Sequence, residues 1–173
     1  MNFYRIGEKV INDNKIHRKV RNILQLREKG YSQAKVAEEL DVKRTLISRL
    51  ENIGEIRKGS KIALVGFPVA NKQEILKMGK KYGLEFMLLL TEQERWSFIE
   101  DKTGLELFNA LMEIMASLKE FDLVIFLGSD MRLDLIDKLM DGKIIGLKLG
   151  KSPITEDKHV EVNKIEKIIN EFL

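Results

Sequence analysis

The chain of 173 residues contains no cysteine, two prolines, two histidines and one tryptophan. Without cysteine it has no disulfides and no thiolate chemistry, which fits a cytoplasmic location. With only two histidines, far apart in the sequence, and no cysteine, a zinc site or a catalytic triad is not expected. No apolar run approaches the roughly 18 residues of a transmembrane helix, and residues 1–5 lack the apolar core of a signal peptide. We therefore expect a cytoplasmic protein without a membrane span.

What the chain does contain is an uneven distribution of charge. Its 44% hydrophobic and 33% charged residues are typical of a folded globular protein. Residues 1–59 carry 14 Lys/Arg against 8 Asp/Glu, a net charge of +6, whereas residues 60–173 carry 16 against 19, a net charge of −3. The basic first part has the electrostatic character of a phosphate-binding module, so double-stranded DNA is the expected partner.

Residues 32–51 have the pattern of two short amphipathic helices joined by a tight turn. Their inward positions follow helical spacing: Val36, Ala37 and Leu40 in the first helix, and Ile47 and Leu50 in the second. Ala37 is small enough for two helices to cross steeply, and Val42 fills the corner between them. Asp41 occupies the turn, where a left-handed backbone is needed and Asp is better tolerated than most residues. The pattern predicts a helix-turn-helix.

This stretch resembles the DNA-binding unit of the Cro and lambda-repressor (XRE) family. The residues that agree in type and spacing are Ser32-Gln33, Val36-Ala37, Leu40, Val42, Ile47-Ser48-Arg49 and Leu50-Glu51. The resemblance covers roughly residues 14 to 58 and implies a transcriptional regulator that binds operator DNA. Two departures stand out: Asp41 replaces the usual glycine, and the fourth and fifth helices of the family are missing.

The rest of residues 1–58 is predicted to complete an all-helical DNA-binding domain. The spacing of Phe3, Ile6 and Val10 predicts a short first helix, and residues 12–14 offer a cap for a second helix from about 15 to 29. Residues 52–60 form a short connection without the composition of a flexible linker. We expect it to hold the two halves of the chain in a fixed relation.

Six polar residues are candidates for DNA contact. They lie at the start of the first motif helix and on the exposed side of the second: Gln33, Lys43, Arg44, Thr45, Ser48 and Arg49. Arg44 and Arg49 are the best candidates for bidentate readout of guanine. The alternative is that most of these side chains contact only phosphates, which positions the protein without specifying a sequence.

From residue 61 onward the pattern alternates between strands and helices. Strands are predicted at residues 61–67, 84–90, 122–127 and 143–149, with a short edge strand at 160–162. Capping boxes are predicted to open helices at Asn71, Thr91 and Thr103, and Asp130 is predicted to cap a further helix. This alternation predicts an α/β fold for residues 61–173, a small doubly wound parallel-sheet (Rossmann-like) domain.

Ligands of such domains bind beyond the carboxyl ends of the strands. The polar candidates at the predicted strand ends are Asn71, Arg95, Ser129, Asp130, Arg132 and Lys151. Together they would suit an anionic or polar small effector. The alternative is that Asn71 and Asp130 are helix caps and that the arginines are solvated. Trp96 either stacks on a ligand or packs at the sheet edge.

The sequence does not favour catalysis. The domain superficially resembles a response-regulator receiver, but Phe67 and Pro68 stand where the acidic pair is needed, and Leu127-Gly128 stands where the phosphate-accepting aspartate is needed. Dinucleotide and P-loop glycine motifs are also absent. We expect a non-enzymatic homodimer that needs no cofactor, with the helix at 105–119 as its interface. The alternative is an α/β enzyme for a small phosphorylated or nucleotide substrate that regulates its own gene through DNA binding.

Overall fold

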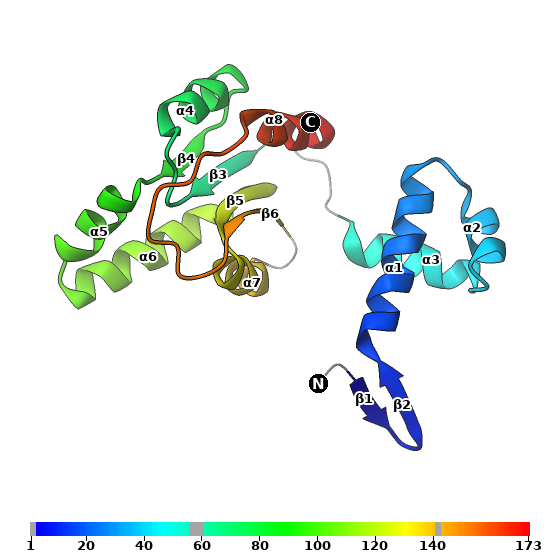
Figure 1. The fold of residues 1–173 in the computed structure, drawn as a ribbon. Helices are drawn as coiled ribbons and strands as arrows, with labels where there is room; N and C mark the ends of the chain where they lie inside the picture. The colour runs from blue at the N-terminus through cyan, green and yellow to red at the C-terminus, as the bar shows by residue number, and fades with distance from the viewer. Residues whose placement is uncertain (1–2, 56–60, 141–142) are drawn as a thin grey trace. The chain divides into compact units, whose positions relative to one another are not determined.

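The computed structural model describes residues 3–55, 61–140 and 143–173 of the chain. The chain divides into two compact units, Met1–Glu55 and Ile56–Leu173 (Figure 1). Part of the predicted connection, residues 56–60, lies outside the described residues, so a fixed relation between the two units stays a prediction. Within the described ranges, no helix has both the length and the apolar composition that crossing a membrane requires.

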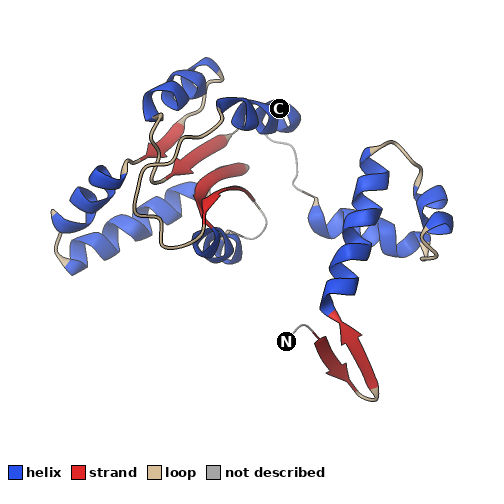
Figure 2. Cartoon of the chain, in the orientation of Figure 1, coloured by secondary structure: helices blue, strands red, loops and turns tan. Residues whose placement is uncertain are grey.

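The first unit opens with a β-hairpin, not with the helix predicted there. Strands β1 (Phe3–Ile6) and β2 (Lys9–Asn12) pair antiparallel, with Ile6 opposite Lys9 (Figure 2). Gly7 stands at the first central position of the two-residue turn with φ of +60°, where a type II′ turn uses glycine. The expectation of an all-helical domain was therefore wrong. The helix was predicted from apolar spacing over residues 3–10, but aromatic and β-branched residues at these positions fit a strand equally well.

A cluster of three helices makes up the rest of the first unit. They are α1 (Asp13–Glu28), α2 (Gln33–Glu39) and α3 (Arg44–Gly54). The predicted cap of α1 is confirmed, since Asn12 Oδ1 accepts a hydrogen bond from the Lys15 amide at 3.0 Å. Ile23, Val36 and Ile47, one from each helix, are fully buried in the centre of the cluster. Asp41 has φ of +50°, so the predicted left-handed turn between α2 and α3 is confirmed.

The second unit is built on a parallel sheet. Its described strands are β3 (Ile62–Gly66), β4 (Phe86–Leu89), β5 (Leu123–Ser129) and β6 (Ile144–Gly150), in the order β4-β3-β5-β6. Every residue of β3 and β5 is buried, as expected for the central strands of a sheet covered on both faces. The chain moves outward in opposite directions from β3 and from β5. The strand order therefore reverses between these two strands.

Helices cover both faces of this sheet (Figure 1). One face packs against α4 (Lys72–Lys81) and α8 (Val162–Phe172), around Leu64, Ile125 and Ile169. The opposite face packs against α6 (Gly104–Leu118) and α7 (Asp130–Leu139), around Val65, Phe126 and Leu118. Helix α5 (Glu92–Glu100) connects β4 to α6.

In the second unit, the predicted capping boxes of α5 and α6 are confirmed, and the caps of α4 and α7 differ from prediction. The side chains of Thr91 and Thr103 each accept a hydrogen bond from the backbone amide of the third helical residue, which is Glu94 or Glu106. The carboxylate of that glutamate accepts a hydrogen bond from the threonine amide in return. Asn71 precedes α4 but makes no side-chain cap, because its amide binds Val160 instead. Ser129, not Asp130, is the residue that precedes α7.

The predicted edge strand at residues 160–162 is not formed. Val160 is buried and bound by Asn71, and α8 already begins at Val162. An isolated parallel bridge joins Val69 to Lys158 nearby. Val160 therefore anchors the segment that crosses from β6 to α8.

Candidate functional site

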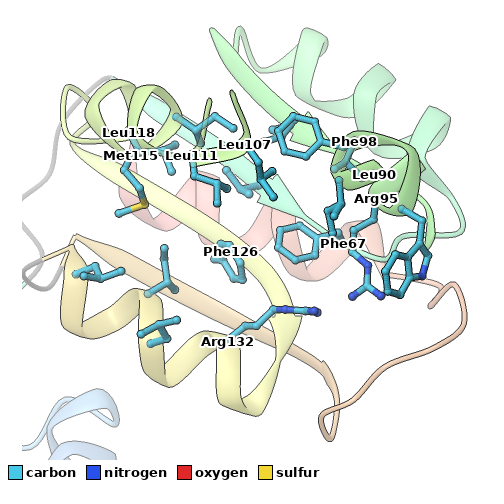
Figure 3. Close-up of a pocket in the computed structure, with 18 residues that line it drawn as sticks. Phe67, Leu90, Arg95, Phe98, Leu107, Leu111, Met115, Leu118, Phe126 and Arg132 are labelled. Carbon is cyan, nitrogen blue, oxygen red and sulfur yellow. The ribbon is translucent and has the colours of Figure 1, made fainter. Parts of the chain in front are cut away.

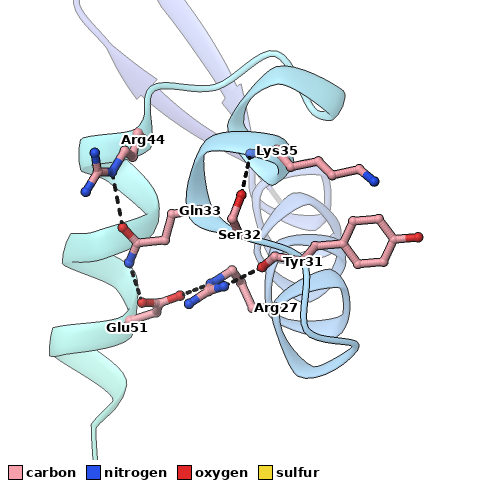
Figure 4. A network of polar contacts seen from close by, with 7 residues as sticks. All are labelled: Arg27, Tyr31, Ser32, Gln33, Lys35, Arg44 and Glu51. Carbon is pink, nitrogen blue, oxygen red and sulfur yellow. Dashed lines mark hydrogen bonds and ion pairs between the residues drawn. The ribbon is translucent and has the colours of Figure 1, made fainter.

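A chain of polar contacts joins the three helices of the first unit (Figure 4). Glu51 on α3 accepts from Arg27 Nε of α1 at 2.5 Å and from Gln33 Nε2 of α2 at 2.6 Å. Gln33 Oε1 in turn accepts from Arg44 Nε at 3.4 Å, and Arg27 also donates to the Tyr31 carbonyl. Two predicted DNA-contact residues, Gln33 and Arg44, are thus oriented by one carboxylate.

The network holds Glu51 in its charged form. The hydrogen bond from Arg27 is the largest influence that lowers the pKa of Glu51 below its ordinary value, and partial burial opposes it. The side chains of Arg27 and Glu51 are each about 30% exposed, so solvent weakens the attraction between them. Glu51 is therefore a structural residue that fixes α3 against α1 and α2.

The predicted DNA-contact residues lie on the outer side of the helix pair. Lys43, Arg44, Thr45 and Arg49 are exposed, while Gln33 and Ser48 are half-buried. On the other side of α3, Ile47 is fully buried in the core of the first unit. Five of the six therefore lie on α3 or directly before it, and Gln33 of α2 is joined to Arg44 by a hydrogen bond.

The second unit contains a cavity of about 620 Å³ between the sheet and helices α5, α6 and α7 (Figure 3). Its floor is formed by side chains of the sheet and of the strand ends, and its walls by apolar faces of the helices. The lining residues are Val65, Phe67, Leu88, Leu90, Arg95, Trp96, Phe98, Ile99, Leu107, Leu111, Ile114, Met115, Leu118, Phe126, Arg132, Leu135, Ile136 and Leu139. All but the two arginines and Trp96 are purely apolar, so the cavity favours an apolar occupant with one polar end.

The two arginines lie together at the end of the cavity near Phe67 (Figure 3), and the Arg95 guanidinium lies 5.4 Å from the centroid of the Trp96 ring. Arg95 donates to Glu92 Oε1 at 2.5 Å, and Trp96 Nε1 donates to the same oxygen at 2.9 Å. Arg132 instead lies over the Phe67 ring, 5.0 Å from its centroid. Its Nη1 is buried and has no hydrogen-bond partner among the described residues.

Electrostatics make Arg132 the unusual member of this cluster. Burial is the main cause that lowers the pKa of its guanidinium, and the positive charge of Arg95 lowers it further. Glu92 opposes both effects. Arg132 as a whole is half-buried, but a buried Nη1 donor without a partner is costly, and an anion placed beside it would relieve that cost.

The start of α5 is held firmly, which fixes Arg95 and Trp96 at the cavity. The capping box of Thr91 and Glu94 sets the first turn, and Lys72 of α4 binds Glu94 at 2.7 Å. The Glu92 amide donates to Asp157 Oδ1 at 2.6 Å. Contacts from two distant segments thus orient the polar end of the cavity.

The other predicted effector residues lie in structural contacts or at the surface. Asn71 binds both backbone groups of Val160 at 2.9 Å. Asp130 accepts from the amides of Ser152 and Met131 at 2.9 Å and pairs with Lys148 at 3.2 Å, and these contacts lower its pKa. Ser129 is fully buried, and Lys151 is exposed. Of the six predicted residues, the structure brings Arg95 and Arg132 to the cavity.

Reasoning from sequence did not find the apolar lining of this site. The signal that was available is α6, which is apolar on more than one side. Leu107, Ile114 and Leu118 face the sheet side, yet Leu105 and Phe108 are also apolar and are 71% and 60% exposed. A helix with a second, exposed apolar stripe is suited to a second contact besides its own sheet.

Comparison of the chain with protein-family models, with curated protein sequences and with solved structures found no match. Within the described ranges, no three His, Cys, Asp or Glu side chains gather where they would hold a metal ion.

Proposed function

We propose that the protein is a sequence-specific DNA-binding transcriptional regulator, with an XRE-type helix-turn-helix in its first unit. The observation that carries the proposal is the division of α3 into two sides. Ile47 is fully buried against α1 and α2, while Arg44, Thr45 and Arg49 are exposed on the outer side. This is the arrangement that a recognition helix needs to enter the major groove.

The second unit, in this proposal, is the regulatory part. Its sheet reverses strand order between β3 and β5, as in doubly wound Rossmann-like folds, which bind ligands at such a point. The polar end of the cavity lies at these strand ends, beside Phe67 and Arg132, and supports binding of a small effector there.

The same unit is proposed to dimerise through α6. Leu105, Phe108 and Met112 follow a spacing of three and four residues and are more than half exposed. An apolar stripe of this kind suits a two-fold contact between identical helices. Helix-turn-helix proteins that bind as dimers contact two half-sites about one turn of DNA apart.

The test of DNA binding is selection of sites from random duplexes, followed by binding titrations at several salt concentrations. We expect a palindromic site with half-sites about 10 base pairs apart, and affinity that falls steeply with salt. Arg49→Ala should cost about 1–3 kcal/mol if the contact is to a base, which is roughly 5- to 150-fold in affinity. Lys80→Ala, an exposed charge in the second unit, is the matched control. Selection that yields no site, or Arg49→Ala binding the selected site like wild type, would refute the assignment.

A further inference from the structure

The cavity of the second unit has the charge of a site for a single anion. Two guanidiniums, Arg95 and Arg132, and one carboxylate, Glu92, meet at its polar end. Glu92 Oε1 accepts from both Arg95 and Trp96, while Glu92 Oε2 and Arg95 Nε are buried without a hydrogen-bond partner among the described residues. Arg132 retains a positive charge and a buried Nη1 donor without a hydrogen-bond partner in the described part of the chain. One acidic group would therefore complete this end.

The remainder of the cavity has the dimensions of a chain-like apolar body. Its wall follows α6 from Leu107 to Leu118, a distance of about 16 Å at 1.5 Å per residue. A hydrogen bond to the guanidinium takes about 3 Å of this length. Carbon–carbon bonds of about 1.5 Å in a zigzag advance about 1.25 Å per carbon, so about ten carbons fill what remains.

The cavity is elongated. Its volume of about 620 Å³ spread over about 16 Å corresponds to a mean cross-section of about 40 Å². The floor is also deep, since Val65 and Phe126 of the sheet are only 3% and 4% exposed. The exposed stripe of Leu105, Phe108 and Met112 is separate from the lining and stays available to a second copy.

We propose that this cavity binds a monocarboxylate with a straight or lightly branched apolar chain of about ten carbons. The carboxylate pairs with Arg132, and the chain lies on the sheet beneath α6 and α7. This ligand class deepens the effector role proposed above and rests on it for its regulatory meaning, but binding itself is measured without DNA.

Trp96 makes the test direct. It is the one tryptophan of the chain, it lines the cavity, and its Nε1 is bound to Glu92 beside the two arginines. Decanoate, at concentrations below micelle formation, is titrated into the full chain while tryptophan emission is recorded. We expect a saturable change in emission. Neutral 1-decanol tests the contribution of the charge, and acetate tests the contribution of the chain. Both should bind at least tenfold more weakly than decanoate.

Two pairs of variants test separately how the carboxylate end and the apolar chain of the ligand are bound. Arg132→Met should abolish the preference for decanoate over 1-decanol, whereas Lys138→Met, an exposed charge on the same helix, should retain it. Leu111→Glu places a like charge in the cavity wall and should weaken decanoate at least tenfold, whereas Asn109→Glu, exposed on α6, should not. Leu111 is 50% exposed, so its variant gives a second test if Arg132→Met does not fold.

The inference is overturned if emission does not respond to decanoate, if 1-decanol binds equally well, or if both cavity variants bind like wild type. The outcome is independent of the DNA proposal. A protein that binds its selected DNA but not decanoate refutes this inference alone, and one that binds decanoate but no DNA refutes only the regulatory proposal.

Discussion

Replacing Asn71 by alanine is expected to weaken the second unit in a way that only its tertiary structure explains. The side-chain amide of Asn71 donates to the Val160 carbonyl and accepts from the Val160 amide, both at 2.9 Å. It also donates to Glu74 at 2.8 Å. One side chain before α4 thus satisfies both backbone groups of a residue 89 positions later, next to the start of α8.

The magnitude follows from these contacts. Each hydrogen bond contributes about 0.5–1.5 kcal/mol net, and Val160 is only 4% exposed, so water replaces the lost partners poorly. We expect Asn71→Ala to lower the free energy of unfolding by about 2–3 kcal/mol. With a slope of about 1.5–2 kcal/mol per molar urea, the midpoint should fall by about 1–2 M.

Urea unfolding followed by Trp96 emission measures this loss in the second unit alone, because the first unit contains no tryptophan. Asn71→Asp should cost more than alanine at neutral pH, since its carboxylate would face Glu74 and the Val160 carbonyl. Asn170→Ala is the control, because that amide makes one exposed contact of 3.4 Å and should change stability by less than about 0.5 kcal/mol. An unchanged midpoint for Asn71→Ala would refute the reasoning.

Two further predictions concern the first unit, both measured by amide hydrogen exchange of α1 to α3. The pKa of Glu51 is lowered mainly by its hydrogen bond from Arg27, so its stabilising contribution is present above the unfolded pKa of about 4.3 and is lost as pH falls through the lower folded value. Wild type should therefore lose protection below about pH 5 relative to Glu51→Gln, and parallel pH profiles would contradict this. Asp41 has φ of +50°, so Asp41→Gly should stabilise the unit by up to about 1 kcal/mol, whereas Asp41→Val should destabilise it by more than about 1 kcal/mol. Equal effects of the two substitutions would show that the turn does not require this backbone conformation.

Local patterns predicted much of the secondary structure. The strands and helices of residues 61–173 follow from apolar runs, glycines and capping boxes, and Thr91 and Thr103 cap the helices that they were predicted to cap. These signals act over a few neighbouring residues, so they can be read along the chain. The helix predicted at residues 3–10 was wrong for the same reason: a segment this short fits either period, and only the pairing of β1 with β2 decides between them.

The candidate sites were predicted unequally. The exposed residues of α3 follow from helical spacing, because one buried face defines the other. At the strand ends, polar residues were identified by position along the chain, which gave Asn71, Asp130, Arg95 and Arg132 equal standing. Distant partners separated them, since Val160 engages Asn71 and Ser152 engages Asp130.

By itself, the sequence determined which segments pair apolar faces with polar ones, where helices begin, and that the positive charge belongs to the part with the helix pair. Tertiary structure alone decided that Arg132 lies over Phe67 without its own carboxylate, and that α5, α6 and α7 leave a cavity above the sheet. The physical reason is the range of the interactions. Periodicity and capping act between neighbours, whereas a buried charge and a cavity depend on side chains that folding brings together from distant parts of the chain.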